Sequence, residues 1–516
     1  MNSKTSRLFC VALTGLLVFG MFPIEAQTSR EEWNQIQKQF QRKYASSDLN
    51  DKIEAVRILG RSNDARAIKI FINLLNQKSL DSAIQAEIFK QLSNFSSDES
   101  VEALVKGVQK QVRDRSVRLR LLQAVGGLKH PEVESMLLKE ADSRDPLVQA
   151  AAIDALGKMG SEKAIPLLAE QFDSKYWQVK VAAIWALARI KKAGSVTALI
   201  TGLGKEKGRL TEDIEEALYA LTGKRFGDNA ALWESWWGVN KSKPNSLAGP
   251  GVEGLHKKAQ KSKKQAAAGG ESGDESEVPT YYGIKIKSKR MVFVIDISSS
   301  MLGPLTRKPK GPQSVISGGG KGSKNEIDWS QIKTKFDLAK AQLIKAIKAL
   351  KSDQYFNIVY YETNISSWKK GLQRATPGNK AAAIKSIEKL VSTGTTNIHG
   401  AFEKAFFIST GAGGKGKNPN DNATIVAKEM RGGVDTIFFL TDGYPTSGPS
   451  IKGVESGRRV GNNMAPNAGY SALLLEEITR WNKDRRIKIN TIGIGDHDKG
   501  LMNQLARRNF GVYVAP

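Results

Sequence analysis

The stretch VFVIDISSSM, residues 292–301, ends an apolar run with an acid and a cluster of hydroxyl groups. Asp296, Ser298 and Ser300 occupy alternate positions, so a turn after a strand can direct their side chains at one point. Carboxylate and hydroxyl oxygens are hard ligands that suit Mg²⁺, Mn²⁺ or Ca²⁺. A catalytic aspartate and a polar turn that caps a helix are the two other interpretations of this pattern.

Two further stretches supply oxygen atoms of the same kind. STGTTNIHGAF contains Thr396, and FLTDGYPTSG contains Asp442, which follows an apolar run just as Asp296 does. Ligands of parallel α/β sheets bind at the carboxyl ends of the strands, where these runs end. The candidate metal site therefore consists of Asp296, Ser298, Ser300, Thr396 and Asp442.

Other chemistries fit these residues less well. A phosphoryl-transfer aspartate of the haloacid dehalogenase type is followed two positions later by a second acid, and this chain has Ser298 there. The glycine-rich GGGKGSK has Gly322 after Lys321, where a P-loop has Ser or Thr. The histidines show no zinc spacing, and no Gly-x-Ser-x-Gly elbow occurs. A metal-free site with helix-capping hydroxyls is the remaining alternative.

The second half of the chain alternates predicted strands and helices. Apolar runs predict strands at 289–298, 354–361, 434–443, 487–495 and 511–515, and helical spacing falls at 336–350, 380–390, 399–409, 471–482 and 500–508. Near-continuous apolar strands that alternate with helices indicate a parallel sheet covered on both faces. The predicted fold class of this half is α/β, doubly wound and Rossmann-like.

The order of the motifs resembles one family. D-x-S-x-S, then T-N-I at the start of a helix, then L-T-D-G after an apolar strand is similar to the von Willebrand factor type A domain, over residues 284–516. The resemblance implies a complete metal-ion-dependent adhesion site. It implies that Ser298, Ser300 and Thr396 bind the ion directly or through water, and that Asp296 and Asp442 hold its waters. It further implies that an acidic residue of a protein partner fills the open coordination position.

Two long stretches depart from the family pattern. One runs from Leu302 to Lys333 and the other from Gly411 to Gly433, and both connect at the edge of the sheet that carries the candidate site. Their Lys and Arg residues favour an acidic ligand if the stretches rim the site, and they are loose insertions otherwise. His399 follows the Thr396 turn and is expected on a solvent-exposed helix face, with a place at the rim of the site as the alternative.

The first half repeats itself over residues 51–222. Six segments align, and their ninth positions lie 33, 33, 31, 31 and 34 residues apart. The fifth positions are Ala55, Ile88, Leu121, Ala152, Ala183 and Ala217, and the ninth are Leu59, Leu92, Val125, Leu156, Leu187 and Leu221. Each segment precedes a polar turn and a second apolar helix. One such pair cannot bury its apolar face alone, whereas stacked pairs can. The pattern resembles a HEAT-type α-solenoid over residues 31–240.

The end of the repeats and the segment after them differ from the rest. Trp233, Trp236 and Trp237 share a helix face, and we expect them to seal the end of the solenoid. Residues 241–283 are rich in Gly, Ser, Lys and Ala and poor in large apolar residues. This composition predicts a basic disordered linker between halves that move independently.

The N-terminus has the pattern of an export signal. Lys4 and Arg7 precede the apolar LFCVALTGLLVFGMF, and Ala26 is a suitable cleavage position, which predicts a signal peptide over residues 1–26. An uncleaved anchor is the alternative. Cys10, the only cysteine, lies inside the predicted signal, so the mature protein has no disulfide. The chain is predicted to be periplasmic, extracellular or at the cell surface, with no transmembrane segment after cleavage.

The formal charge of the 516-residue chain is +26. Such an excess suits an acidic partner such as an anionic cell-surface polymer, and a solubilising surface charge is the alternative interpretation. Nucleic acid is not expected, because no aromatic-plus-basic motif of nucleic-acid-binding modules occurs.

These patterns predict a non-enzymatic, exported adhesion or scaffold protein that binds an acidic ligand group through a divalent cation, most simply Mg²⁺. One alternative is a regulatory subunit of a cell-envelope assembly that docks through its solenoid. Another is a metal-dependent hydrolase or chelatase-type component, although the sequence shows no general base or nucleophile beside the metal motif and no ATPase.

Overall fold

A computed structural model describes residues 29–77, 80–110, 115–258, 278–305, 327–409, 430, 432–460, 463–467 and 469–516. The predicted signal peptide, residues 1–26, lies outside these ranges, as do residues 306–326 of the first predicted insert and residues 411–429 and 431 of the second. The chain divides into two compact units, Met1–Gly107 and Val108–Pro516. No helix of the described ranges combines the length and apolar character needed to cross a membrane.

The first unit is helical. It contains α1 (Arg30–Tyr44), α2 (Leu49–Arg61), α3 (Ala65–Leu75), α4 (Ser82–Leu92) and most of α5 (Asp98–Lys110). The side chains of Ser29, Asp48, Asp64 and Asp81 accept hydrogen bonds from the first turns of α1 to α4. Such N-caps satisfy backbone N–H groups that have no partner inside the helix, so the sequence itself sets where these helices begin.

The second unit continues the helical pairs. Its helices are α6 (Arg115–Val125), α7 (Pro131–Glu140), α8 (Pro146–Met159), α9 (Ile165–Glu170), α10 (Trp177–Ile190), α11 (Ala193–Lys205), α12 (Arg209–Thr222) and α13 (Ala230–Asn240). Proline stands in the first turn of α7, α8 and α9, where its missing N–H costs no hydrogen bond. The predicted all-α repeat architecture is confirmed.

The repeated apolar positions form the core of these helices. All twelve side chains at the fifth and ninth positions of the six aligned segments are fully buried, at 0 % exposure. The segments fall in α2, α4, α6, α8, α10 and α12. Periodic apolar residues therefore became the buried face of one helix in each pair, as the sequence period predicts.

Small residues allow neighbouring repeats to approach closely. A Cβ atom built on Gly126 of α6 would lie 2.7 Å from the Cα of Ala155 in α8, and one on Gly157 of α8 would lie 2.5 Å from the Cα of Ala186 in α10. These distances are shorter than van der Waals contact, and the neighbouring atoms belong to the helix backbone, which cannot move aside as a flexible side chain can. Glycine is thus required at the helix–helix contact itself.

The tryptophan-rich helix α13 packs against α11, as expected for a terminal repeat. Trp233 is fully buried, and Trp237 is 5 % exposed. The indole N–H of Trp237 donates a hydrogen bond of 3.0 Å to Oγ1 of Thr197 in α11, and the indole N–H of Trp233 donates one of 3.0 Å to the carbonyl of Gly227. Both polar groups of the buried rings are satisfied, which fits a structural role for this helix.

The predicted linker is ordered in its first part. Residues 251–258 form α14 (Gly251–Lys258), which packs on α12 and α10 and buries Val252. The N–H of Gly249 donates a hydrogen bond of 2.9 Å to the carbonyl of Leu221. The prediction of disorder is therefore wrong for this part, because one valine and backbone hydrogen bonds tie it to the solenoid. The last residues of the predicted linker, 278–283, are also ordered, since they contain the strand Thr280–Tyr281 and Tyr281 is buried. Residues 259–277 lie outside the described ranges.

The second half of the chain forms one sheet with helices on both faces. The strand order is β11-β10-β7-β3-β4-β5, and β6 also pairs with β4. The strands are β3 (Arg290–Asp296), β4 (Tyr355–Tyr361), β5 (Ile365–Ser367), β6 (Gln373–Arg374), β7 (Thr436–Thr441), β10 (Lys488–Gly493) and β11 (Tyr513–Val514). The five strands predicted from apolar runs are parallel to one another, and β5 and β6 add an antiparallel edge.

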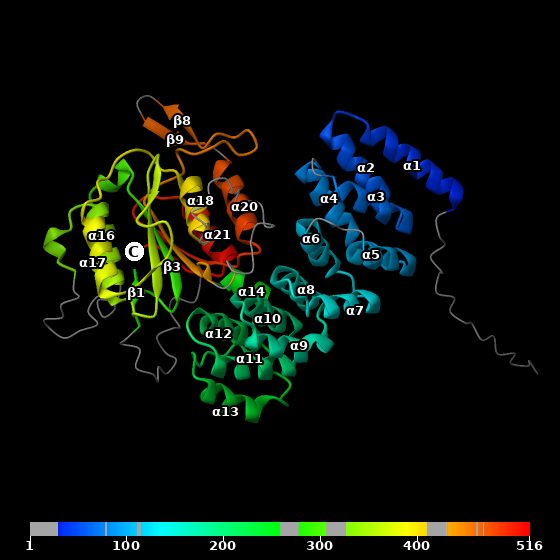
Figure 1. Ribbon diagram of the computed structural model, residues 1–516, viewed down its shortest axis with the longest axis horizontal. Coiled ribbons are helices and arrows are strands. Elements are labelled where there is room, and N and C mark those ends of the chain that lie inside the picture. Colours follow the sequence, from blue (N-terminus) through cyan, green and yellow to red (C-terminus); the bar gives the residue numbers. More distant parts are fainter. Residues whose placement is uncertain are drawn as a thin grey trace, which may run out of the picture. The chain divides into compact units, whose positions relative to one another are not determined.

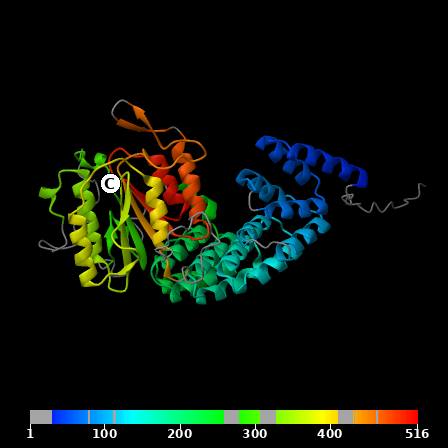
Figure 2. The same cartoon turned by 45° about the horizontal axis from the view of Figure 1, so that its top comes forward.

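Helices from different parts of the chain cover the two faces. Figure 1 shows α16 (Lys335–Ala349) and α17 (Pro377–Glu388) on one face, and α18 (Ile398–Ser409), α20 (Tyr470–Asn482) and α21 (Lys499–Arg508) on the other. The turned view in Figure 2 shows the same layers. Two short hairpins, β1 (Thr280–Tyr281) with β2 (Ile284–Lys285) and β8 (Gly457–Val460) with β9 (Asn463–Pro466), were not predicted. The doubly wound α/β fold is confirmed.

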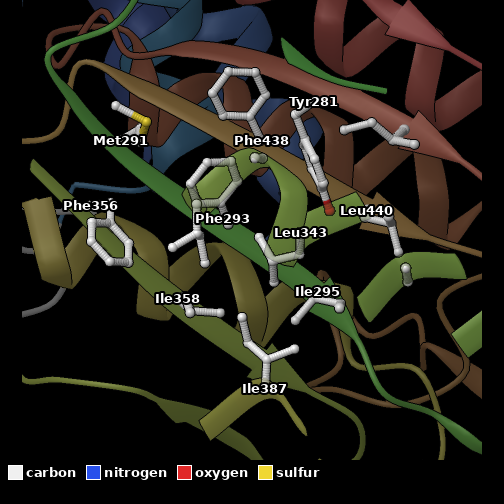
Figure 3. Close-up of a cluster of buried hydrophobic side chains, with 14 of the residues drawn as sticks. Tyr281, Met291, Phe293, Ile295, Leu343, Phe356, Ile358, Ile387, Phe438 and Leu440 are labelled. Carbon is white, nitrogen blue, oxygen red and sulfur yellow. The ribbon is translucent and has the colours of Figure 1, made fainter. Parts of the chain in front are cut away.

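The core under α16 and α17 is aromatic and aliphatic. Figure 3 shows Phe293 of β3 beside Phe438 of β7, with Phe356 and Ile358 of β4 next to them. The rings of Phe293 and Phe438 stack with centroids 5.4 Å apart, and Tyr281 of β1 meets both rings edge-on. This packing fixes β3 between β4 and β7, which places the carboxyl ends of β3 and β7 side by side.

The amino ends of the same strands contact the solenoid. The guanidinium of Arg209, at the start of α12, donates a hydrogen bond of 2.7 Å to the carbonyl of Asp435 and one of 3.1 Å to the carboxylate of Asp213. The ammonium of Lys488, which begins β10, donates one of 2.7 Å to Glu212. The sequence predicted no contact between the two halves, and these buried charged groups form one within the second unit.

An apolar contact accompanies the charged one. The ring of Trp185 in α10 stacks on that of Phe510, with centroids 4.9 Å apart. Arg486, before β10, pairs with Asp154 of α8. Gly208, the residue before α12, has a positive φ of 73°, and a Cβ atom on it would lie 2.9 Å from the carbonyl oxygen of Lys287. The contact between the solenoid and the sheet is thus formed by α8, α10 and α12 on one side and by residues at the amino ends of the strands on the other.

Two matched glycines test the close packing of the repeats. Gly157→Ala should destabilise the protein by about 2 kcal/mol, because the added methyl group must push α8 away from α10. Gly238→Ala, at the same distance from the end of α13, meets nothing within 4 Å and should stabilise it by about 0.5–1 kcal/mol through helix propensity. Urea unfolding of both variants measures the difference, and equal effects would contradict the packing.

A second pair of variants tests the contact between solenoid and sheet. Lys488→Ala should cost about 3 kcal/mol, because it removes the cation that pairs with Glu212 and leaves the buried carboxylate of Asp213 with Arg209 as its partner. Lys452→Ala, which removes a lysine from an exposed pair with Glu476, should change stability by less than about 1 kcal/mol. Chemical unfolding of the full chain compares them. Equal losses would show that Lys488 does not join the two halves.

Candidate metal centre

The five predicted site residues come together at the carboxyl edge of the sheet. The Oγ atoms of Ser298 and Ser300 lie 3.0 Å apart, and the hydroxyl of Ser300 donates a hydrogen bond of 2.7 Å to Oδ1 of Asp442. The hydroxyl of Thr396 donates one of 3.3 Å to Oγ of Ser298. The backbone N–H of Ser298 donates one of 2.8 Å to Oδ1 of Asp296. One continuous chain of contacts therefore joins all five.

The strand register explains this meeting. Ile295 of β3 pairs with Leu440 of β7, so the residues that follow, Asp296 on one strand and Thr441 and Asp442 on the other, are neighbours. β3 is also the strand at which the chain changes direction across the sheet, since β4 lies on one side of it and β7 on the other. Sites of open α/β sheets form at such switch points.

Asp296 is the buried base of the site, with 0 % exposure. In addition to the N–H of Ser298, its carboxylate accepts hydrogen bonds from the hydroxyls of Thr441, at 2.7 Å, and Tyr361, at 3.2 Å. Burial, together with the negative charge of Asp442, raises the pKa of Asp296 to about 6. Loss of solvent disfavours the charged form, and the three donors only partly compensate.

Asp442 is held from both sides. Its Oδ1 accepts from Ser300, and its Oδ2 pairs with the ammonium of Lys335, the first residue of α16. The side chain of Asp442 is 0 % exposed and that of Lys335 is 16 % exposed. Lys335 supplies a positive charge to this edge of the sheet that the sequence interpretation missed. A lysine in the first helical turn, where the helix dipole disfavours cations, was the available signal.

The loop that carries Thr396 is fixed to its neighbours by hydrogen bonds of its backbone groups. The N–H of Thr396 donates to Oγ1 of Thr446 at 3.1 Å, and the N–H of Thr446 donates to the carbonyl of Thr396 at 3.0 Å. The N–H of Ser299 donates to the carbonyl of Gly394 at 3.0 Å. The loops after β3 and β7 and the loop before α18 thus support one another, so the hydroxyl groups are positioned before any ligand arrives.

His399, which was expected to be exposed, is buried at 9 % exposure. Its Nε2 lies 3.4 Å from a carboxylate oxygen of Glu477 in α20, and its ring meets Trp481 edge-on. The position on α18 faces α20, because α18 and α20 cover the same face of the sheet. His399 is therefore part of a helix–helix contact.

The donor set fits a small divalent cation. The cluster offers carboxylate and hydroxyl oxygens, which suit Mg²⁺, Mn²⁺ or Ca²⁺. A Cβ atom built on Gly443 would lie 3.5 Å from Oγ1 of Thr396 and 3.8 Å from Oγ of Ser300, so the glycine keeps the space beside these hydroxyls open. The described ranges hold no cluster of three His, Cys, Asp or Glu side chains suited to a metal.

Family models agree with this fold and its order of parts. Residues 327–515 match a model of the von Willebrand factor type A domain, and residues 111–188 match one of HEAT repeats. The chain therefore carries HEAT repeats followed by a von Willebrand factor type A domain. The first match includes Thr396 and Asp442 and begins after Asp296, Ser298 and Ser300, which the sheet register places beside them.

Curated relatives are similar over the same half. Inter-alpha-trypsin inhibitor heavy chain H3 of Mesocricetus auratus is 26% identical over 168 residues, which are 33% of this chain and 14% of the relative. Heavy chain H2 of Homo sapiens is 27% identical over 177 residues, which are 33% of this chain and 15% of the relative. The chain thus spans about one seventh of the length of these relatives.

Among solved structures, a von Willebrand factor type A protein from Catenulispora acidiphila is similar with 17% identity and a TM-score of 0.28, covering 45% of this chain and 39% of the other.

The buried carboxylate of Asp296 predicts a pH dependence of stability. Its folded pKa of about 6 lies above the unfolded value of about 3.9, so the folded state binds more protons between these values. With chelator present, the contribution of Asp296 to the free energy of unfolding should be largest below about pH 4. It should fall by about 3 kcal/mol as the pH rises through 6. Asp296→Asn should remove this fall. Chemical unfolding at pH 4 and pH 7 measures both proteins, and parallel pH profiles would contradict the assignment.

Proposed function

We propose that residues 284–516 bind a divalent cation, most simply Mg²⁺, through Asp296, Ser298, Ser300, Thr396 and Asp442. The observation that supports the proposal most directly is the chain of contacts from Thr396 through the two serines to Asp442. Three segments that are distant in the sequence present hydroxyl and carboxylate oxygens to one place. When bound, the cation would offer a positive centre to which an acidic ligand group can attach.

The surface beside the site suits a protein ligand. Leu302, two residues after Ser300, is 55% exposed, and Tyr444, two residues after Asp442, is 36% exposed. Exposed large apolar side chains next to a charged centre are typical of the buried part of protein–protein interfaces. We therefore propose a partner that supplies an acidic side chain to the cation and apolar surface to Leu302 and Tyr444.

The function proposed for the whole chain is a non-enzymatic adhesion or scaffold protein. The HEAT repeats supply an extended helical surface, and the type A domain supplies the ligand site. His399, the histidine near the site in the sequence, is engaged by Glu477 and Trp481, which does not favour a role as general base. The charge of +26 supports an additional affinity for an anionic surface polymer. Export rests on the predicted signal peptide at residues 1–26.

Thermal unfolding with and without metal tests the site. Mg²⁺ should stabilise the chain, because a ligand that binds only the folded state at a concentration about a hundred times its Kd contributes about 2.7 kcal/mol. Asp296→Ala should abolish the stabilisation by Mg²⁺ and Mn²⁺, and Ser298→Ala should reduce it, since it removes one neutral ligand.

Asp353→Ala is the matched control. Asp353 is exposed and 4.0 Å from Lys289, at the opposite end of the sheet, so its removal should leave the metal-induced stabilisation unchanged. Stabilisation of equal size in wild type and Asp296→Ala would place the ion elsewhere. A wild-type protein that no divalent cation stabilises would favour the metal-free alternative. Turnover of a substrate that needs the same residues would favour the hydrolase alternative.

A further inference from the structure

Lys335 reaches the candidate site through a passage walled by two glycines. A Cβ atom on Gly303 would lie 3.1 Å from Cε of Lys335, and one on Gly495 would lie 3.2 Å from its Cδ. The backbone N–H of Lys335 donates a hydrogen bond of 3.1 Å to the carbonyl of Gly303. The loops after β3 and β10 therefore both leave room for this side chain, and its ammonium group ends on Oδ2 of Asp442.

Helix stability does not explain a lysine at this position. Lys335 is the first residue of α16, directly after the N-cap Thr334, whose hydroxyl accepts from Asp337 in a capping box. The positive end of the helix dipole lies here, so a cation is disfavoured by a few tenths of a kcal/mol to about 1 kcal/mol. Asp337 meets the preference for an acid in this turn, whereas Lys335 opposes it. The interaction that offsets this cost is the ion pair with Asp442.

The ion pair uses a carboxylate that the proposed cation also needs. Ser300 holds Oδ1 of Asp442 and Lys335 holds Oδ2, so both oxygens of this side chain are engaged within the protein. A divalent cation attached through Asp442 would have to share the carboxylate with the ammonium group or displace it. The ammonium group and a divalent cation on the same carboxylate would repel each other strongly, because the side chain of Asp442 is fully buried and little water screens the two positive charges.

We infer that Lys335 is a tethered cation that competes with the divalent ion for Asp442 and thereby sets the ion affinity of the site. The inference rests on the proposed function, since it concerns the same residues. It assigns α16 a part in ion binding although none of the five ligand positions lies on it. It also means that Asp442 keeps a positive partner at all times, either the ammonium group or the ion.

Lys335→Met tests the inference, because it keeps the length of the side chain and removes the charge. In the full chain, titration calorimetry with Mg²⁺ and Mn²⁺ should show at least a tenfold lower Kd than in wild type. Lys335→Arg, which keeps the charge, should bind the ions as wild type does or more weakly. Lys333→Met is the matched control, since Lys333 is exposed two residues earlier and its removal changes the net charge equally. It should leave the Kd unchanged.

Stability gives a second readout that does not depend on ion binding. With chelator, Lys335→Met should melt below wild type, because Asp442 loses its partner while it remains buried, and saturating Mg²⁺ should reverse the order of the two proteins. Should Lys335→Met not fold, Lys335→Gln, which keeps a hydrogen-bond donor, replaces it in both measurements.

The outcomes separate the two ideas. A wild-type chain that binds Mg²⁺ and a Lys335→Met variant with an equal or higher Kd would overturn the competition while the metal site stands. Failure of every variant to bind either ion would overturn both. An equal gain in affinity for Lys333→Met would mean that general charge, and not the contact with Asp442, controls the Kd.

Discussion

The pairing of β3 with β7 is the constraint on which the candidate site depends. Ile295 lies beside Leu440, and this register brings Asp296 next to Thr441 and Asp442. A shift by one residue would turn the apolar side chains of β3 to the opposite faces of the sheet. The stacked rings of Phe293 and Phe438 oppose such a shift, so the packing of the core and the geometry of the site are fixed by the same contacts.

β7 is bounded at both ends by a buried acid. Asp435 precedes the strand, and its carbonyl accepts from Arg209 of the solenoid, while Asp442 follows the strand and pairs with Lys335. Burial raises the pKa of Asp435, and the nearby guanidinium groups of Arg209 and Arg290 counteract this effect. A strand of this length spans about 20 Å. One rigid element therefore connects the contact with the HEAT repeats to the candidate ligand site.

The repeats reach that contact through close helix packing. Gly126 and Gly157 allow α6, α8 and α10 to approach at backbone distance, and α12 continues the row with Arg209 at its start. A solenoid transmits its shape from one repeat to the next because each contacts only its neighbours. Small residues in this row therefore decide where α12 presents its charges to the sheet.

The sequence alone determined the two architectures and the composition of the site. The repeat of about 33 residues, the apolar strand runs and the D-x-S-x-S pattern depend on local periodicity and residue type, which can be read without coordinates. Asp296, Ser298, Ser300, Thr396 and Asp442 were all named from these patterns, and the structure joins them by hydrogen bonds. Their role in binding a cation remains a proposal.

Tertiary structure alone decided which distant charges meet. The place of Lys335 in the first turn of its helix indicates that its charge needs a partner but does not identify Asp442, because the space between Gly303 and Gly495 forms only when the loops after β3 and β10 come together. The contacts of Arg209 and Lys488 and the ordering of α14 are of the same kind. Each depends on segments that are distant in the sequence and meet only in the folded chain, whereas periodicity records only which face of a single helix or strand is buried.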